Sequence, residues 1–431
     1  MKLKTTLLAA MVGLLSTPEV IAAPKNIIYM IGDGMGPAYT TAYRYFKDDA
    51  NTKVVEPTIF DSMLVGMAHT YPDDDTIVTD SAAGATALST GTKSYNGAIA
   101  VDTHKAHLET MLEMAKKQGK TTALVATSQI NHATPASFAA HNESRRNYNE
   151  IADDYMDLKI NDKPAVDLML GGGTSYFIRE DRNLVAEFKQ AGYQYIDSLD
   201  ALDSISSLPA LGLFAEKGLP HALDEAPMRL TAMTKQALKL VDNSSDAGFF
   251  MMIEGSQIDW CGHANDIACA MAEMDDFAES IKLAKAYVDN NPDTILVITA
   301  DHSTGGLTLG AHGQYRWERD VVAKVTGSAR VIAEKLSQAK DVKAVWQSTT
   351  GLEYDSATEL KLKAALKNDN RAVEKVVKEA IDLASFTGWT TGGHTAIDVP
   401  VYAYGKGYEN FIGSHNNTAI ADKLIEFIRK Q

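Results

Sequence analysis

The sequence predicts an α/β fold with a large, mostly parallel central sheet sandwiched by helices, together with a helical insertion. Two observations predict this architecture. Short runs made almost wholly of apolar residues recur along the chain, which is typical of strands buried on both faces. Helical stretches, such as residues 107–117 and 267–288, separate these runs. The composition, with 45% apolar and 23% charged residues, is that of an ordinary globular protein and excludes a disordered or collagen-like chain.

The first element, residues 1–22, has the pattern of a secretory signal peptide. Lys2 and Lys4 precede an apolar run over residues 7–15, and small residues follow near the predicted cleavage point. The run is shorter than the ~20 residues that a spanning helix needs, although a retained N-terminal anchor is the alternative interpretation. We therefore expect a periplasmic or secreted chain of residues 23–431 that forms a single α/β domain and has no membrane-spanning segment.

Four apolar runs follow in order, and polar residues stand at or just after the end of each. The runs cover residues 25–31, 121–127, 249–253 and 294–300. The polar residues that follow them are, in the same order, Asp33; His132 and Thr134; Glu254; and Asp301 with His302. Any one of these groups fits an ordinary turn or helix cap. Because ligands of parallel sheets bind beyond the carboxyl ends of the strands, the four together predict a single functional site at that edge.

The residue types at this edge favour metal binding over acid–base catalysis. Asp259 and His263 are four residues apart, so a helical turn places both on one face, as two ligands of one Zn²⁺ require. Glu254 then addresses a neighbouring ion, and His394 stands just before a further strand at residues 399–404. Mixed carboxylate and imidazole sites favour Zn²⁺ with a harder ion such as Mg²⁺ beside it. The alternatives are a solvated helix face for Asp259 and His263 and a turn residue for His394.

Ser81 begins a segment of small residues, 81–87, that favours an abrupt helix start. Free N–H groups at that start, together with the helix dipole, would face an anion bound beside the hydroxyl. A nearby metal ion would lower the pKa of the hydroxyl and make it a nucleophile. The alternative is that the segment is only a helix cap, and the two interpretations are compatible.

Charge and cysteine content restrict the partners and the covalent structure. The net charge of −15, without a long basic stretch, makes nucleic acid a poor partner. Cys261 and Cys269 lie eight residues apart in what the sequence suggests is one helix. A continuous helix would separate them by ~12 Å, beyond the ~7 Å limit for a disulfide, so free thiols are expected even in an oxidising compartment.

Taken in order, these motifs resemble those of alkaline phosphatases. The matching segments are Gly32-Asp33-Gly34-Met35-Gly36, Thr79-Asp80-Ser81-Ala82-Ala83, Glu254-Gly255-Ser256-Gln257-Ile258-Asp259 with His263, Thr299-Ala300-Asp301-His302 and Gly393-His394-Thr395. They span most of the chain. The resemblance implies a periplasmic homodimer that hydrolyses phosphate monoesters at alkaline pH through a phosphoserine intermediate, with two Zn²⁺ and one Mg²⁺ per subunit.

The resemblance also implies a role for each site residue. The first zinc is assigned to Asp259, His263 and His394; the second, beside Ser81, to Asp33, Asp301 and His302; and the magnesium to Glu254, Thr134 and a second oxygen of Asp33. Arg145 is expected to bind two phosphate oxygens, with Arg146 as the neighbouring alternative.

Two further positions differ from the enterobacterial pattern of the family. His132 and Trp260 stand where enterobacterial relatives have Asp and Lys. These residues are expected to line the substrate site; the alternative is that His132 only donates a hydrogen bond and Trp260 only packs on its helix. They would make the third metal site less suited to Mg²⁺ and weaken the hold on bound phosphate.

Residues 310–385 are interpreted as the family's variable insertion, which covers the site and contributes to the dimer. A sulfatase of the same superfamily is disfavoured, because it would need Pro and Arg at the positions of Ala83 and Ala85. A phosphodiesterase or phosphomutase relative, and a non-catalytic phosphate-binding or metal-binding protein, remain as alternatives.

Overall fold

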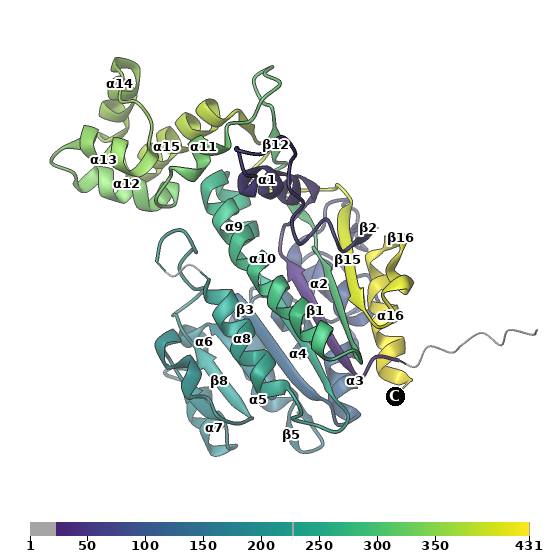
Figure 1. The fold of residues 1–431 in the computed structure, drawn as a ribbon. Coiled ribbons are helices and arrows are strands. Elements are labelled where there is room, and N and C mark those ends of the chain that lie inside the picture. Colours follow the sequence, from purple (N-terminus) through teal and green to yellow (C-terminus); the bar gives the residue numbers. More distant parts are fainter. Residues whose placement is uncertain (1–22, 226–227, 431) are drawn as a thin grey trace, which may run out of the picture.

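A ten-stranded mixed sheet forms the centre of the molecule in the computed structural model, which describes residues 23–225 and 228–430 (Figure 1). The predicted signal peptide lies outside these residues. The strand order is β16-β2-β15-β10-β1-β9-β3-β6-β8-β7. The strands are β1 Asn26–Gly32, β2 Leu64–His69, β3 Thr121–Gln129, β6 Leu168–Gly172, β7 Gln194–Ile196, β8 Ala210–Leu213, β9 Phe249–Gly255, β10 Thr294–Thr299, β15 Val399–Gly405 and β16 Gly413–Asn416.

The strands with long apolar runs are parallel to one another, as buried strands of this type usually are. The neighbouring strands from β10 to β7 all run parallel, and Ile27 of β1 pairs with Ile295 of β10 on one side and with Phe250 of β9 on the other. β15 is antiparallel to β10 and to β2, and β16 runs parallel to β2 at the edge. The predicted mostly parallel α/β sheet is therefore confirmed. The sequence prediction lacked β2, β7 and β16, which are short and only partly buried, and β6 and β8, which are buried but only five and four residues long.

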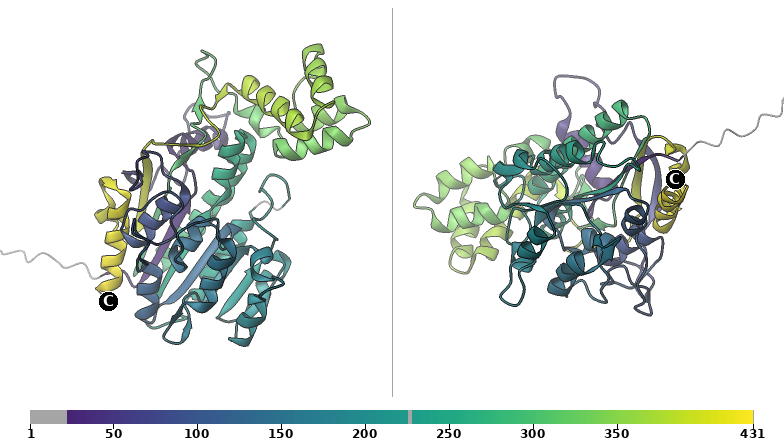
Figure 2. Two further views of the ribbon diagram at one scale, coloured as in Figure 1. Left: turned by 180° about the vertical axis from the view of Figure 1, so that it is seen from behind. Right: turned by 90° about the horizontal axis from the view of Figure 1, so that it is seen from below.

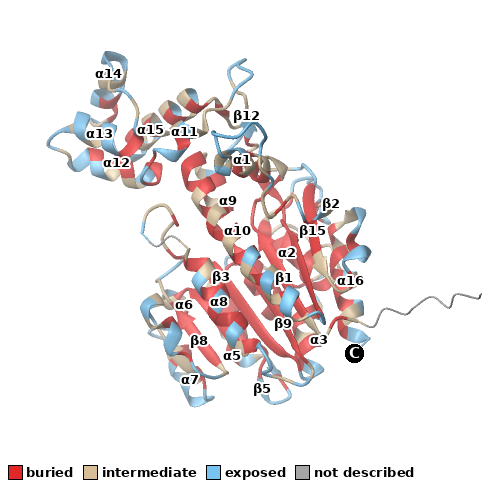
Figure 3. Cartoon of the chain, in the orientation of Figure 1, coloured by how far each residue is buried: buried red, intermediate tan, exposed pale blue. Residues whose placement is uncertain are grey.

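Helices cover both faces of the sheet. α8 and α10 pack on one face; α3 and α4 pack on the other, where α2 lies against α4 and α16 lies against α2 (Figure 2). Strands and inward helix faces are buried, and exposed residues lie on the outside (Figure 3). These helices are α1 Pro37–Lys47, α2 Ser81–Thr90, α3 Met111–Lys117, α4 Ala133–Ala139, α5 Tyr148–Asp157, α6 Thr174–Phe177, α7 Leu184–Gln190, α8 Arg229–Val241, α9 Gln257–Ala264, α10 Ile267–Asn290 and α16 Asn417–Arg429, with 3₁₀ turns η1 Leu199–Ser204 and η2 Tyr408–Phe411. None of the helices in the described ranges is long and apolar enough to cross a membrane.

The two cysteines form a disulfide, so the prediction of free thiols was wrong. α9 ends at Ala264, where Asn265 adopts the left-handed conformation, and Asp266 then caps α10 by accepting a hydrogen bond from the Cys269 N–H at 3.1 Å. The chain thus turns between the two cysteines, and their Cα atoms lie 5.5 Å apart. The ~12 Å expectation assumed one continuous helix, which these caps interrupt.

Short strand pairs join the segments on either side of a group of helices that extends from the sheet domain (Figure 1). The pairs are β11 Ser303–Thr304 with β14 His394–Thr395 and β12 Thr308–Leu309 with β13 Thr387–Gly388, and a separate small pair joins β4 Lys159–Ile160 to β5 Lys163–Pro164. Between β12 and β13 lie α11 Arg319–Ala323, α12 Ala329–Gln338, α13 Val342–Thr350, α14 Ser356–Ala365 and α15 Asn370–Ser385. Trp346 of α13 is fully buried among them.

Candidate metal and phosphate site

The carboxyl ends of four parallel strands bring the predicted residues together. Asp33 follows β1, Glu254 lies in β9, Asp301 and His302 follow β10, and α4 carries Thr134 after β3. Strand register aligns these ends, since Ile31 of β1 pairs with Glu254 of β9 and with Thr299 of β10. α9 adds Asp259 and His263, and β14 adds His394 from a segment far along the chain.

Within the described residues, three groups of ligand atoms at this edge each fit around one ion. The groups are Asp33, Asp301 and His302; Asp259, His302 and His394; and Asp33, His132 and Glu254. In each group the atoms lie within 4.8 Å of one another. Asp33 and His302 each belong to two groups, so the three candidate sites are contiguous. His263 joins the second group, because its Nε2 lies 3.3 Å from Asp259 and 3.1 Å from His394 Nε2.

The histidine rings are oriented by hydrogen bonds on their outer nitrogens. His263 Nδ1 lies 2.7 Å from the Gly392 carbonyl oxygen, and His394 Nδ1 lies 2.8 Å from that of Thr79. Thr304 Oγ1 lies 3.2 Å from His302 Nδ1 and also contacts Asp259. These contacts leave each Nε2 facing the carboxylates, as is usual for metal-binding histidines.

The carboxylates of the site are buried close together, and fewer positively charged side chains than carboxylates lie beside them. Neither oxygen of Asp33 has a hydrogen-bond partner among the described residues, and neither does Glu254 Oε1. Burial, followed by repulsion from Asp301, raises the pKa of Asp33 well above its ordinary value. Burial raises the pKa of Glu254 to about 7 and lowers the pKa of His302, which favours its neutral, ligating form. Bound cations would relieve these costs, so the residues fit a metal centre.

Ser81 is the first residue of α2 and faces this centre. Its Oγ lies 3.1 Å from His302 Nε2. The helix cap is supplied by Asp80, whose side chain accepts from the Ala83 N–H at 3.0 Å, so the Ser81 hydroxyl is not used in capping. The small residues matter here: a Cβ on Gly84 would lie 3.1 Å from the Asp301 carbonyl oxygen, so glycine allows α2 to approach the strand end closely.

Arg145, rather than Arg146, points into the site. Its guanidinium donates to Asp80 Oδ2 at 3.0 Å and contacts His132 Nε2 at 3.2 Å, while Arg146 is exposed. By accepting this hydrogen bond, Asp80 orients the Arg145 guanidinium. The sequence analysis missed this role, although Asp80 stands beside Ser81 in the motif. It also missed Thr304, and Ser256, which donates to Glu254 at 2.7 Å. Apart from proximity to a site residue in the sequence, nothing distinguishes these hydroxyls from ordinary loop polar groups.

His132 and Trp260 lie together beside the third group of ligands. Their rings meet edge to face, with centroids 5.8 Å apart. His132 is buried, and burial together with the Arg145 charge lowers its pKa to about 3, so the imidazole is neutral. The Trp260 ring packs against the loop at Gly218, where an added Cβ would lie 2.3 Å from Trp260.

The comparisons with known proteins agree with one another. The family model described as "Alkaline phosphatase" matches residues 24–429. Alkaline phosphatase 3 of Bacillus subtilis is 47% identical over 412 residues, which covers 94% of this chain and 89% of that protein. The repressible alkaline phosphatase of Saccharomyces cerevisiae is 32% identical, covering 94% and 81%.

Solved structures give the same result. A cold-active alkaline phosphatase from a psychrophilic Shewanella species superposes with a TM-score of 0.90 at 46% identity, covering 94% of this chain and 99% of that one. The alkaline phosphatase of the Antarctic bacterium TAB5 gives 0.71 at 30% identity, covering 95% and 99%. The chain therefore belongs to the alkaline phosphatase family and hydrolyses phosphate monoesters, as its motifs predicted.

Proposed function

We propose that hydrolysis proceeds by transfer of the phosphoryl group to Ser81 at a centre that holds two Zn²⁺ and one Mg²⁺. The observation that carries the proposal is the position of the Ser81 hydroxyl, uncommitted to capping, at a helix N-terminus and 3.1 Å from a residue shared by two candidate metal sites. Metal-dependent chemistry is general to this family, and one TAB5 mutant structure, 31% identical, is described as having Mg bound in its M3 site.

The three groups support the ligand sets in part: they contain each assigned residue except Thr134 and His263, and His263 lies beside Asp259 and His394. We assign one zinc to Asp259, His263 and His394, and the other to Asp33, Asp301 and His302. Glu254, Thr134 and the second Asp33 oxygen form the site for the harder ion, which suits oxygen ligands, with His132 at its edge. When bound, such cations lower the pKa of a nearby hydroxyl or water and neutralise charge on the phosphate and leaving group.

The protein's own residues supply the rest. The α2 N-terminus presents backbone N–H groups to an anion beside Ser81. Arg145, oriented by Asp80, binds two phosphate oxygens and neutralises charge in the transition state. Ser81 Oγ attacks phosphorus, the alcohol leaves, and water then attacks the phosphoserine to release phosphate and restore the hydroxyl.

Trapping the intermediate tests the mechanism. Enzyme quenched in acid during turnover should carry one phosphate on the peptide containing Ser81, as measured by mass spectrometry. Ser81→Ala should lose this label and retain its metal content, because Ser81 is only one of several groups around its zinc. Thr79→Val is the matched control and should keep the label. A label that persists in Ser81→Ala would place the nucleophile elsewhere.

We also propose that residues 1–22 are removed on export and that the mature enzyme is a periplasmic or secreted homodimer. The supporting observations are the Lys2 and Lys4 pair before an apolar run and exposed apolar residues at the sheet edge, where Leu64 and Ile412 are more than half exposed. The N-terminal sequence of the exported protein and its mass by sedimentation test both points. A mature N-terminus at Met1 or a monomer would contradict them.

A further inference from the structure

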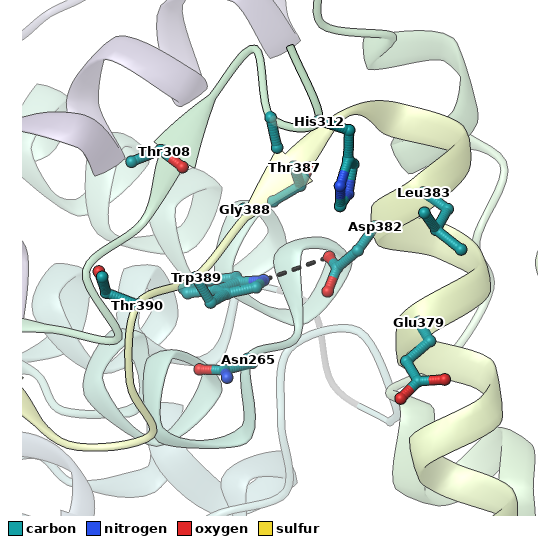
Figure 4. A pocket seen from close by; sticks show the side chains of 11 residues that line it. Asn265, Thr308, His312, Glu379, Asp382, Leu383, Thr387, Gly388, Trp389 and Thr390 are labelled. Carbon is teal, nitrogen blue, oxygen red and sulfur yellow. Dashed lines mark hydrogen bonds between the residues drawn. The ribbon is translucent and has the colours of Figure 1, made fainter. Parts of the chain in front are cut away.

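A cavity of about 590 Å³ lies where the helical segment meets the sheet domain, outside the metal centre (Figure 4). Three of its walls come from α15, from the turn after β12 and from the segment around β13, and Asn265 closes it from the α9–α10 turn. No residue of the three metal groups lines it. The residues that the argument uses are Asn265, His312, Glu379, Asp382, Leu383 and Trp389.

The cavity combines an aromatic surface with negative charge. The Trp389 indole Nε1 donates to Asp382 at 3.2 Å, and the ring lies between His312 and Asn265 (Figure 4). Glu379 contributes a second carboxylate from the preceding turn of α15. No Lys or Arg is found among the lining residues that the structure describes. Lys378, nearby on the same helix, pairs with Glu374 at 3.1 Å.

The charge of Asp382 is therefore poorly compensated. Burial, with added repulsion from Asp266 and Glu379, raises the pKa of Asp382 to about 7, although the Trp389 hydrogen bond and the Lys378 charge act in the opposite direction. At the alkaline pH where this family works, the carboxylate is ionised, and among the described residues its one hydrogen-bond donor is the neutral Trp389 indole. A cationic ligand would reduce this cost, and the part of the half-buried Trp389 indole that faces the cavity offers it a favourable contact.

The geometry favours an organic cation over a metal ion. Asp382, Glu379 and His312 do not form one of the groups of three ligand atoms within 4.8 Å that the described residues contain. Their spacing leaves a volume typical of small-molecule sites, with apolar contacts from Trp389 and Leu383. We propose that this cavity binds a small organic ammonium ion, with the cationic head at Asp382 and Trp389 and a compact apolar body along Leu383.

The cavity also contacts the segment that carries His394. In the orientation that satisfies its hydrogen bonds, the Asn265 amide donates to the carbonyl oxygens of Thr391 at 3.0 Å and Gly262 at 2.8 Å. His263, a residue of the metal centre, contacts the next carbonyl along, that of Gly392. A ligand on Trp389 thus lies beside the 389–394 segment but outside the metal centre, and it binds there whether or not Ser81 is the nucleophile.

Isothermal titration of the metal-loaded full chain tests the proposal, with choline as the probe and its neutral isostere 3,3-dimethylbutan-1-ol as the comparison. Both titrations are made in an amine-free buffer with saturating inorganic phosphate, which blocks the metal centre. Choline should bind once per chain, and the isostere about tenfold or more weakly. Equal affinity for the two probes, or no binding of choline, would overturn the proposal.

Variants locate the binding. Asp382→Asn should weaken choline binding by about tenfold, and Leu383→Lys, a substitution at a half-exposed position, should abolish it by placing a competing cation in the cavity. Glu334→Gln, on the exposed face of α12, is the charge-matched control and should bind choline normally. Loss of binding in the control to the same degree, or unchanged binding in both cavity variants, would refute this location. Metal content and phosphoserine labelling should stay normal in all three.

Discussion

Removing the metals should make the stability of the enzyme depend steeply on pH. In the folded apo enzyme, Glu254 has its pKa raised from 4.5 to about 7, mainly by burial. Between these values the folded state holds a proton that the unfolded chain releases, so the free energy of unfolding falls as pH rises. At about 1.4 kcal/mol per pKa unit, Glu254 alone accounts for a loss of about 3 kcal/mol. Burial also raises the pKa values of Asp33 and Asp301, which act in the same direction. The lowered pKa values of His132, His302 and His394 act the opposite way below about pH 6.5, so the comparison with Glu254→Gln isolates the Glu254 contribution.

Urea unfolding of chelator-treated enzyme at about pH 5 and about pH 8 measures this loss, since the midpoint should fall while the slope stays constant. The metal-loaded enzyme should show no such fall, because bound cations hold the carboxylates ionised and stabilise the native state by mass action. Apo Glu254→Gln is the matched variant and should lose about 3 kcal/mol of the dependence. A Glu254→Gln variant whose apo stability changes with pH as much as that of the parent would refute the reasoning.

Four further variants test phosphate binding, the third metal site and the disulfide. Arg145→Lys should raise KM and weaken inhibition by inorganic phosphate by about tenfold or more, because a lysine cannot make the paired contacts; steady-state kinetics would show it. Trp260→Lys should tighten phosphate inhibition by about tenfold and lower kcat if release limits turnover, with an unchanged inhibition constant as the contrary result. His132→Asp should increase activation by Mg²⁺, measured by titration of the metal-depleted enzyme, and equal activation would count against it. Replacing both Cys261 and Cys269 by Ser should cost about 2.5 kcal/mol in urea unfolding, given their separation of eight residues.

The sequence predicts the centre of this fold well because the buried parallel strands leave continuous apolar runs. β1, β3, β9 and β10 each have this pattern, and their ends carry the site residues. β2 and β16 lack it, because their positions depend on pairing with distant partners at a partly exposed edge.

The sequence prediction missed the break between α9 and α10 for a different reason. Asn265 and Asp266 together form a helix stop followed by a helix cap, and both signals are present in the sequence. The regular apolar spacing across them obscured the break and with it the disulfide. At the site, residue types and order predicted the side chains that the strand ends bring together. The hydrogen bonds from Asp80 and Thr304 required knowledge of which loops face each other.

The pairing of β12 with β13 makes the helical segment a removable module. Thr308 pairs with Gly388 and Leu309 with Thr387, so the two ends of a segment of more than 70 residues meet as neighbouring antiparallel strands. The entropy of closing that long loop is thereby separated from the catalytic centre, where β11 and β14 pair independently. A two-residue turn of the Asn-Gly type could join Leu309 to Thr387 directly. We therefore expect that the helices can be exchanged or enlarged with the geometry at His302 and His394 left in place, provided that the hydrogen bonds of Ser328 to Asp224 and of Ala329 to Asp266 are kept.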